Sequence, residues 1–442
     1  MHDADLAETT PAASRAGIEA ATMRLVSRRF MPLLLAAYIS SYLDRVNIGF
    51  AALTANHDLG LSPKSYGWGA GLFFVGYFLF EFPSNLILER VGARRWIARI
   101  MLTLGLVSAA MAFVTGPWSF FAARFLLGVA EAGFFPGVIL FLTYWFPRRY
   151  RARFIGLFML GIPVSSLIGA PISGMLLGLD GLWGLRGWQW LYVLEALPSL
   201  VLAGLSWRLL TDRPAKAAWL DGEQRAWLQD TLAGEMAGAP PHARLGYFGS
   251  MLNGRVLFYA AIFFNLTAPS YGLSLWLPQI VKNFGLSDIQ TGFVSAIPFA
   301  FGSVAMILWG RHSDRHRERV WHTSVCGFVA AAGLAACVLT TSPVLQMVAI
   351  AAASIGIFGI KGPFLAMMSE AFSGPGAAGG IAMATALGNL SGFLPPYIVG
   401  WIRAETGSFP LGLLFLATLS AVGAVHVLGS SRFERWQVGH AA

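Results

Sequence analysis

Charged side chains are scarce in this sequence. Asp, Glu, Lys and Arg together make up 12% of the 442 residues, whereas soluble globular domains contain about 25%. Hydrophobic residues make up 56%, and the mean hydropathy is +0.61. A chain with so few charges cannot cover a folded particle with polar surface, so most of that surface must face lipid. This composition excludes a soluble enzyme and an intrinsically disordered protein.

Cysteine and the common catalytic motifs are almost absent. The two cysteines, Cys326 and Cys337, are eleven residues apart, about 16 Å along a helix axis and too far to bridge each other. The sequence has no phosphate-binding Gly-Lys-Ser/Thr motif, no Gly-x-Ser-x-Gly elbow and no His-Glu-x-x-His motif. His312 and His316 have a metal-ligand spacing but lie in an arginine-rich loop, which repels cations. We therefore predict neither an enzyme, nor a cofactor, nor a metal site.

Twelve apolar segments are each long enough for the ~20 residues that cross a bilayer as a helix. They are expected at residues 30–55, 66–88, 96–114, 118–144, 152–178, 189–210, 256–281, 289–309, 320–341, 343–368, 377–402 and 409–429. These runs lack the alternation of a barrel strand, so they indicate helices in contact with a lipid bilayer. The prediction is an all-α membrane protein with both termini on one side.

The basic residues indicate which side faces the cytoplasm. Arginines cluster after the second, fourth and eighth segments, at residues 90–99, 148–153 and 311–319, and the opposite connections carry few. Cytoplasmic loops are typically enriched in Lys and Arg. Both termini are therefore expected in the cytoplasm. Because these loops account for the net charge of +9, no nucleic-acid partner is predicted.

The longest polar stretch divides the chain into two groups of six segments. The expected organisation is a cytoplasmic tail, a six-helix bundle, a linker, a second bundle and a second tail, at residues 1–29, 30–210, 211–255, 256–429 and 430–442. A basic, turn-rich loop follows the second segment of each half, at 88–95 and 310–319, which indicates an internal duplication. The linker's partial helical periodicity favours a helix along the membrane surface over a lid.

Five charged residues interrupt the apolar segments. They are Asp44, Arg45, Arg124, Glu131 and Lys361. Each costs at least ~2.5 kcal/mol at the bilayer centre, so such residues face a polar interior or one another. Static ion pairs between helices explain one pair but not three cations with two acids, so a functional cavity is favoured. One arrangement pairs Asp44 with Arg124 and leaves Arg45 open to the cavity near Glu131.

Two further acids and three glycines are given structural roles. Glu81 and Glu195 lie toward the ends of their segments, beside basic loops or tryptophans. Gly128, Gly133 and Gly137 permit close approach of the fourth segment to its neighbours.

Several motifs together resemble the major facilitator superfamily over roughly residues 25 to 430, and within it the anion:cation symporter branch. They are Tyr42-Leu-Asp-Arg-Val-Asn47, Phe82-Pro-Ser-Asn-Leu-Ile-Leu-Glu-Arg-Val-Gly-Ala-Arg-Arg95, Arg124-Phe-Leu-Leu-Gly-Val-Ala-Glu-Ala-Gly133, Tyr144-Trp-Phe-Pro147, Tyr271-Gly-Leu-Ser-Leu-Trp-Leu-Pro278 and Gly388-Asn-Leu-Ser-Gly392. The resemblance implies twelve helices in two pseudo-symmetric bundles. It also implies proton-driven uptake of a small organic anion, by alternating access, across a bacterial inner membrane.

The resemblance also implies roles for individual residues. Asp44 and Glu131 would bind protons, Arg45 would hold the substrate carboxylate, and Arg124 would support the charge pairs. The side chains expected to line the cavity are Tyr42, Tyr77, Tyr271 and Asn389. Lys361 departs from the family pattern, which has no lysine before Gly-Pro-Phe. With Arg45 it would clamp both ends of a dicarboxylate, although a structural ion pair or a contact with the polar tail of a monocarboxylate remains an alternative.

Symport is not the only function that fits these residues. An anion exchanger or exporter of the same fold is an alternative, because the direction of transport follows the gradients. A sensor that binds the anion without transporting it is less favoured. A monomer is the default oligomeric state.

Overall fold

The computed structural model describes residues 10–237, 253–372 and 377–440, and in these ranges the chain is helical without strands. The helices of the first half are α1 (Thr10–Val46), α2 (Ile48–Asp58), α3 (Pro63–Val91), α4 (Ala93–Ala110), α5 (Pro117–Glu131), α6 (Phe134–Trp145), α7 (Arg148–Leu177) and α8 (Gly187–Leu209). Those of the second half are α11 (Gly254–Lys282), α12 (Asp288–His316), α13 (Val320–Val338), α14 (Pro343–Gly359), α15 (Lys361–Ala371), α16 (Ala377–Asn389), α17 (Leu394–Thr406) and α18 (Pro410–His440).

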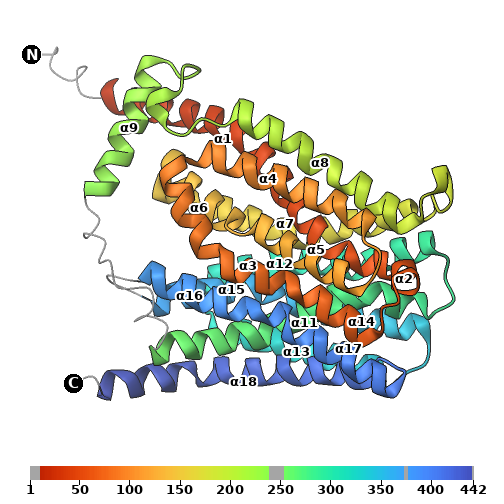
Figure 1. Cartoon of the computed structure of the whole chain (residues 1–442). Helices are drawn as coiled ribbons and strands as arrows, with labels where there is room; N and C mark the ends of the chain where they lie inside the picture. The colour runs from red at the N-terminus through yellow and green to blue at the C-terminus, as the bar shows by residue number, and fades with distance from the viewer. Residues whose placement is uncertain (1–9, 238–252, 373–376, 441–442) are drawn as a thin grey trace, which may run out of the picture.

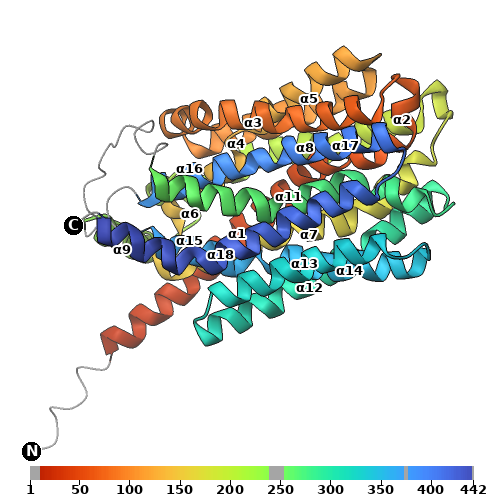
Figure 2. The same ribbon diagram turned by 90° about the horizontal axis from the view of Figure 1, so that it is seen from below.

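In the described ranges these sixteen helices make twelve crossings, because α1–α2, α5–α6, α14–α15 and α16–α17 are broken pairs that each cross once. Ten crossings are long and apolar enough to span a membrane by length and composition. The other two are α1–α2, which carries Asp44 and Arg45, and α16–α17, in which neither piece exceeds 13 residues. In Figure 2 the long helices lie side by side along one direction, as in a bundle that crosses a bilayer. The predicted twelve-helix membrane fold is confirmed.

The expected segments 118–144, 343–368 and 377–402 are interrupted near their middles. In the first, α5 ends at Glu131 and α6 begins at Phe134, with Gly133 between them in the left-handed region at φ +83°. In the second, the break at Ile360 makes Lys361 the first residue of α15. Sequence periodicity did not predict these breaks, since the apolar runs continue through them. They place Glu131, Lys361 and Asn389 at helix ends inside the bundle.

The first and last helices of the chain extend beyond the expected membrane segments. α1 begins at Thr10, about 20 residues before the expected start, and α18 continues to His440. Figure 1 shows both described ends on the same side of the bundle. Within the expected linker 211–255, α9 (Gly222–Ala237) is helical and lies at this same end, while residues 238–252 lie outside the described residues.

The two halves pack tightly at the end opposite the termini. Helix α3 packs against α17 and α7 against α12. The Tyr66 hydroxyl of α3 donates a hydrogen bond to the Leu275 carbonyl of α11 at 2.9 Å. Where α7 crosses α12, a Cβ atom on Gly174 would lie 2.9 Å from the Cα of Gly292, so the two backbones touch. This end of the molecule is closed.

Small residues also allow close packing inside the first half. A Cβ atom on Gly128 would clash with the Phe73 carbonyl of α3, and one on Gly133 would clash with the Ser84 side chain. The role predicted for these glycines, close approach of the fourth crossing to its neighbours, is therefore confirmed.

Candidate functional site

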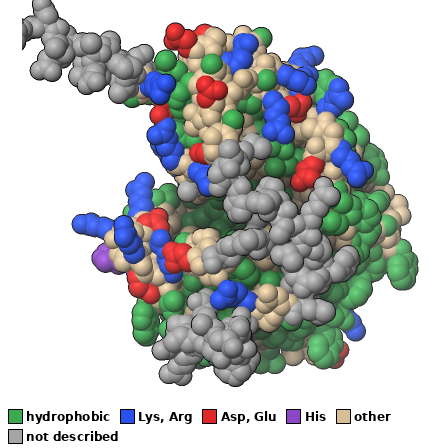
Figure 3. Space-filling model, turned by 90° about the vertical axis from the view of Figure 1, so that its left-hand side faces the viewer, with side chains coloured by type: hydrophobic (Ala, Val, Ile, Leu, Met, Phe, Trp, Pro, Cys, Tyr) green, Lys and Arg blue, Asp and Glu red, His purple; other side chains and the backbone are tan. Residues whose placement is uncertain are grey.

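A cavity of about 880 Å³ lies between the two halves, and we call it the central cavity. Its walls come from α1, α3, α6 and α7 of the first half and from α11, α14, α15 and α16 of the second. Figure 3, which views the end that carries the termini, shows a hollow lined by apolar side chains on this face. Its polar lining residues are Tyr38, Tyr42, Arg45, Tyr77, Glu81, Asn85, Thr143, Thr267, Tyr271, Lys361, Ser369, Thr385 and Asn389.

Arg45 is the cation that the first half presents to the central cavity. One of its Nη atoms lies 2.5 Å from Oε1 of Glu131, and the two side chains are 13% and 3% exposed. The guanidinium carbon also lies 5.3 Å from the ring centre of Tyr77 and 5.4 Å from that of Tyr42. Nε of Arg45 and Oε2 of Glu131 have no hydrogen-bond partner. Arg45 therefore lies between a buried acid and the cavity, with donor capacity left for an anion.

Asp44 lies away from the cavity and is completely buried. Ser108 and Ser199 donate hydrogen bonds to its two carboxylate oxygens, at 2.6 and 2.9 Å. The expected ion pair with Arg124 is wrong, because no basic group of the described residues lies within 4 Å of this carboxylate. Adjacent positions on a helix point about 100° apart, and Asp44 consequently faces α4 and α8 while Arg45 faces the cavity.

Arg124 is also completely buried and forms no ion pair with a described residue. Its Nη2 donates to the Ala70 carbonyl at 3.3 Å, and its guanidinium carbon lies 5.3 Å from the ring centre of Phe73. Nε and Nη1 have no hydrogen-bond partner. Arg124 thus contacts α3 rather than the acid that the sequence suggested for it.

The four side chains expected to line the cavity do so. Tyr42 and Tyr77 approach it from the first half, and Tyr271 and Asn389 from the second. The Tyr271 hydroxyl donates a hydrogen bond to the Asn389 side-chain oxygen at 3.2 Å, and its ring lies 4.5 Å from that of Phe74. Phenol and amide groups thus border the space in front of Arg45, where they can bind hydroxyl and carboxylate groups.

Lys361 lines the central cavity from the second half. Among the described residues it makes no hydrogen bond and no ion pair, so the structural ion pair considered from the sequence is not formed here. The break at Ile360 directs the start of α15 into the bundle. Two cations, one from each half, therefore border one cavity.

Glu81, to which the sequence analysis assigned a structural role, also lines the central cavity. Its Oε2 atom is buried without a hydrogen-bond partner. Tyr77, Glu81 and Asn85 follow one another at four-residue steps and so share one face of α3. That spacing, starting from the correctly placed Tyr77, was the signal that could have identified Glu81.

His312 and His316 lie at the end of α12. Nδ1 of His312 lies 2.7 Å from Nε2 of His322, and Nδ1 of His322 lies 2.6 Å from Glu318. The part of the chain that the structure describes contains no group of three His, Cys, Asp or Glu side chains that could hold a metal ion.

Comparison with known proteins identifies the family. The Major Facilitator Superfamily model matches residues 34–396 and 270–440. The chain belongs to the major facilitator superfamily. The expected membership is therefore confirmed, and the protein is a multi-pass membrane transporter rather than an enzyme.

Two relatives illustrate the range of this superfamily. A protein of Agrobacterium vitis named "Putative tartrate transporter" is 50% identical over 411 residues, which cover 93% of this chain and 91% of that protein. A "Quinolone resistance transporter" of Acinetobacter baumannii is 42% identical over 91% of this chain and 93% of its own length. Among solved structures, a D-xylose–proton symporter superposes with a TM-score of 0.72 at 14% identity, covering 90% of this chain and 96% of that one. This last likeness concerns the fold.

Proposed function

We propose that this transporter imports a small organic anion, a dicarboxylate or sugar acid, together with protons. The observation that carries the proposal is Arg45, a cation in the central cavity whose partner is the buried acid Glu131. The name of the tartrate transporter relative supports this substrate class. The resemblance to the anion:cation symporter branch points in the same direction.

The Arg45–Glu131 pair provides a physical mechanism for coupling. While Glu131 is ionised, it occupies the guanidinium and repels an incoming carboxylate. Protonation removes that repulsion and leaves the guanidinium fork free for a carboxylate. Empty and fully loaded carriers can then reorient, whereas a half-loaded carrier keeps an unpaired buried charge at a cost of several kcal/mol.

Asp44 is the second proposed proton-binding residue. Two serine hydroxyls hold its carboxylate in a fully buried site, and no described basic group forms an ion pair with it. An ionised carboxylate in such a place lacks a counter-ion, and binding a proton removes that cost. Arg124 supports the charge balance through its contacts with α3 rather than through an ion pair.

We place both termini in the cytoplasm, together with the linker 211–255 that joins the six-helix bundles 30–210 and 256–429. The arginine clusters support this orientation by the positive-inside rule. With it, the central cavity opens inward and the packed end faces the periplasm. We further propose that the protein acts as a monomer in the inner membrane.

Export or exchange is the second candidate function. The quinolone resistance transporter supports it, since a relative of 42% identity bears a name that refers to drug resistance. Arg45 and Lys361 in the cavity favour an anionic substrate over a neutral drug.

Uptake by purified protein in proteoliposomes tests the proposal. Tartrate is expected to accumulate inside vesicles when the exterior is acidic, and a proton ionophore is expected to abolish accumulation. Exchange of internal for external tartrate without response to the pH gradient would favour an exchanger, and binding without either flux would favour a sensor.

Lys361→Met is expected to weaken uptake of dicarboxylates selectively, by about tenfold, because it removes the cation of the second half while roughly keeping side-chain length. Uptake of hydroxylated monocarboxylates should change by less than about threefold. The measurement is a substrate panel at equal protein content, with Lys64→Met, at the start of α3, as the control. An unchanged substrate profile together with a lower melting temperature would make Lys361 structural.

A further inference from the structure

Glu195 is a buried acid to which the proposed mechanism gives no role. It lies on α8 and is 2% exposed. Ser173 of α7 donates a hydrogen bond to its Oε1 at 2.6 Å, while its Oε2 has no hydrogen-bond partner. No basic side chain of the described residues lies within ion-pair distance. A carboxyl group in such a place is satisfied only by a proton and by a further polar partner.

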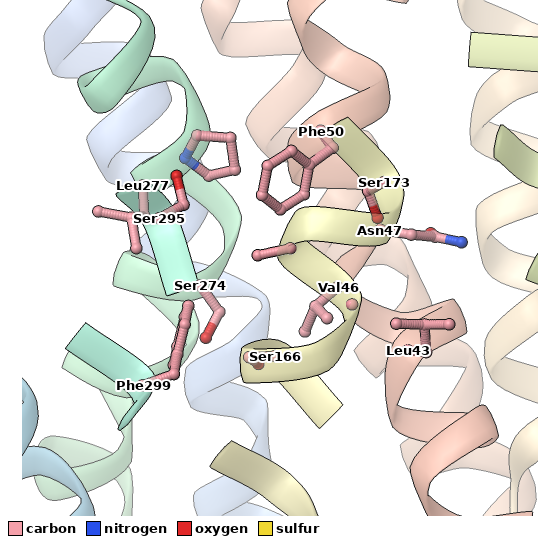
Figure 4. Close-up of a pocket in the computed structure, with 13 residues that line it drawn as sticks. Leu43, Val46, Asn47, Phe50, Ser166, Ser173, Ser274, Leu277, Ser295 and Phe299 are labelled. Carbon is pink, nitrogen blue, oxygen red and sulfur yellow. The ribbon is translucent and has the colours of Figure 1, made fainter. Parts of the chain in front are cut away.

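A small cavity lies on the other side of Ser173 and is lined by it. Its volume is about 10 Å³, close to the minimum for one water molecule. Figure 4 shows Ser274 and Ser295 of the second half facing Val46 and Phe50 of the first half around this space, which we call the interface cavity. Its other polar lining residues are Asn47, Ser166 and Ser173.

The lining of the interface cavity is short of hydrogen-bond partners. The hydroxyls of Ser166 and Ser295 are buried without any, and the Asn47 side chain, which lies beside Glu195, forms no hydrogen bond of good geometry. Buried waters typically make about three hydrogen bonds to groups of this kind. One water in this cavity would therefore satisfy several orphaned atoms at once and would lie next to the hydroxyl that bonds Glu195.

The position of the interface cavity gives this water an access route. Its walls come from α1, α2 and α7 of the first half and from α11 and α12 of the second, where the two halves pack at the closed end. Alternating access requires these contacts to separate when the central cavity closes. In that outward-open state, the interface cavity becomes part of the water-filled entrance.

Glu195 also lies close enough to Asp44 for the two carboxyl groups to interact electrostatically. Ser199 lies four residues after Glu195 and so on the same face of α8. The Ser199 hydroxyl donates to Oδ2 of Asp44 at 2.9 Å and also contacts the Ser40 hydroxyl at 2.8 Å. Tyr192 interacts electrostatically with both acids, and Asp44 also interacts with Glu131 and Arg124.

We propose that Glu195 is an additional proton-binding residue, through which protons from the periplasmic side reach Asp44. A hydronium in the interface cavity gives a proton to the Ser173 oxygen and becomes water, while the hydroxyl proton of Ser173 moves to the Glu195 carboxylate. The side chain of protonated Glu195 then turns from Ser173 toward Ser199, one helical turn away, and gives its proton to the Ser199 oxygen while the hydroxyl proton of Ser199 moves to Asp44. Only O–H bonds form and break, and one proton is transferred in total. This inference rests on the proposed proton coupling.

Glu195→Gln tests the relay, because glutamine accepts the Ser173 hydrogen bond but cannot carry the proton. In proteoliposomes, uptake driven by a pH gradient is expected to slow at least about tenfold. Exchange of internal for external substrate should stay within about twofold, since it moves no net protons, and the substrate KM should not change. The matched control is Glu405→Gln, an exposed acid on α17, which should leave both activities unchanged.

Two further variants separate a relay from a structural role. Glu195→Asp restores a carboxyl group and is expected to recover part of the pH-driven uptake that glutamine loses. Ser173→Ala should lower the ratio of net uptake to exchange by about threefold. Equal loss of both activities with a lower melting temperature, or wild-type rates in Glu195→Gln, would overturn the inference. If the wild-type protein itself shows no pH-driven uptake, it is instead the proposed function that fails.

Discussion

Replacing Arg45 with alanine is expected to lower substrate affinity at least about 30-fold, which corresponds to ~2 kcal/mol. The guanidinium is the cation of the first half that borders the central cavity, and Nε of Arg45 has no protein partner. Arg45→Lys should weaken binding by about tenfold, because an ammonium cannot form the two parallel hydrogen bonds that a guanidinium gives to a carboxylate. Calorimetry with tartrate on detergent-solubilised protein measures both effects.

Removing Arg45 also leaves Glu131 buried without its partner, which lowers stability independently of binding. The double variant Arg45→Ala/Glu131→Gln removes the unpaired carboxylate charge. It should therefore have a melting temperature close to that of the wild-type protein but should not regain substrate affinity. Arg208→Ala, at the exposed end of α8, is the control for loss of an arginine. Unchanged affinity in Arg45→Ala would mean that another residue, with Lys361 the first candidate, holds the anion.

The sequence identified most of the candidate site because intramembrane charges are expensive and therefore rare. Arg45, Glu131 and Lys361 stood out for that reason, and the structure places all three around or beside one cavity. Helical spacing also separated the directions of Asp44 and Arg45 correctly. The family resemblance supplied the cavity-lining tyrosines and Asn389, which composition alone does not distinguish from ordinary polar residues of a helix.

What the sequence missed depends on packing between helices. The pairing of Asp44 with Arg124 failed because serine hydroxyls on α4 and α8 lie closer to Asp44, and nothing in the spacing of Ser108 and Ser199 reveals that. Serine is common in apolar segments, where its hydroxyl can bond to its own helix backbone. The helix break before Lys361 was missed because Gly359 and Ile360 continue an apolar run.

The acids Glu81 and Glu195 show a related limit. Each was judged from its distance to a basic loop or to tryptophans, which does not specify the face of the helix on which the residue lies. Glu81 shares the cavity-facing stripe of Tyr77, whereas Glu195 faces Ser173 in the interior of the first half. Before an acid in a membrane segment is given a structural role, its helix face should therefore be compared with that of the residues expected to line the cavity.

Glu131→Gln is expected to abolish accumulation driven by a pH gradient while keeping exchange, because the amide imitates the protonated acid permanently. The rate of pH-driven uptake by this variant should fall to that of protein-free vesicles. Asp44→Asn should also abolish accumulation, and Glu89→Gln, an exposed acid near the end of α3, is the control. Full accumulation by both Asp44→Asn and Glu131→Gln would contradict proton coupling through these residues.

The pH dependence of substrate binding distinguishes the two acids. In the wild-type protein, ionised Glu131 competes with the substrate for Arg45, so affinity should fall as the pH rises. Glu131→Gln removes the competitor, and its affinity should be nearly independent of pH. The Asp44 side chain forms no hydrogen bond or ion pair with that of Arg45 and is held by two hydroxyls instead. Asp44→Asn should therefore keep the wild-type decline in affinity, and calorimetry across a pH series on the two variants measures the difference. If the affinity of Glu131→Gln fell with rising pH as steeply as that of the wild-type protein, Glu131 would not be the group that competes for Arg45. The Arg45–Glu131 pair would then not be the origin of proton coupling.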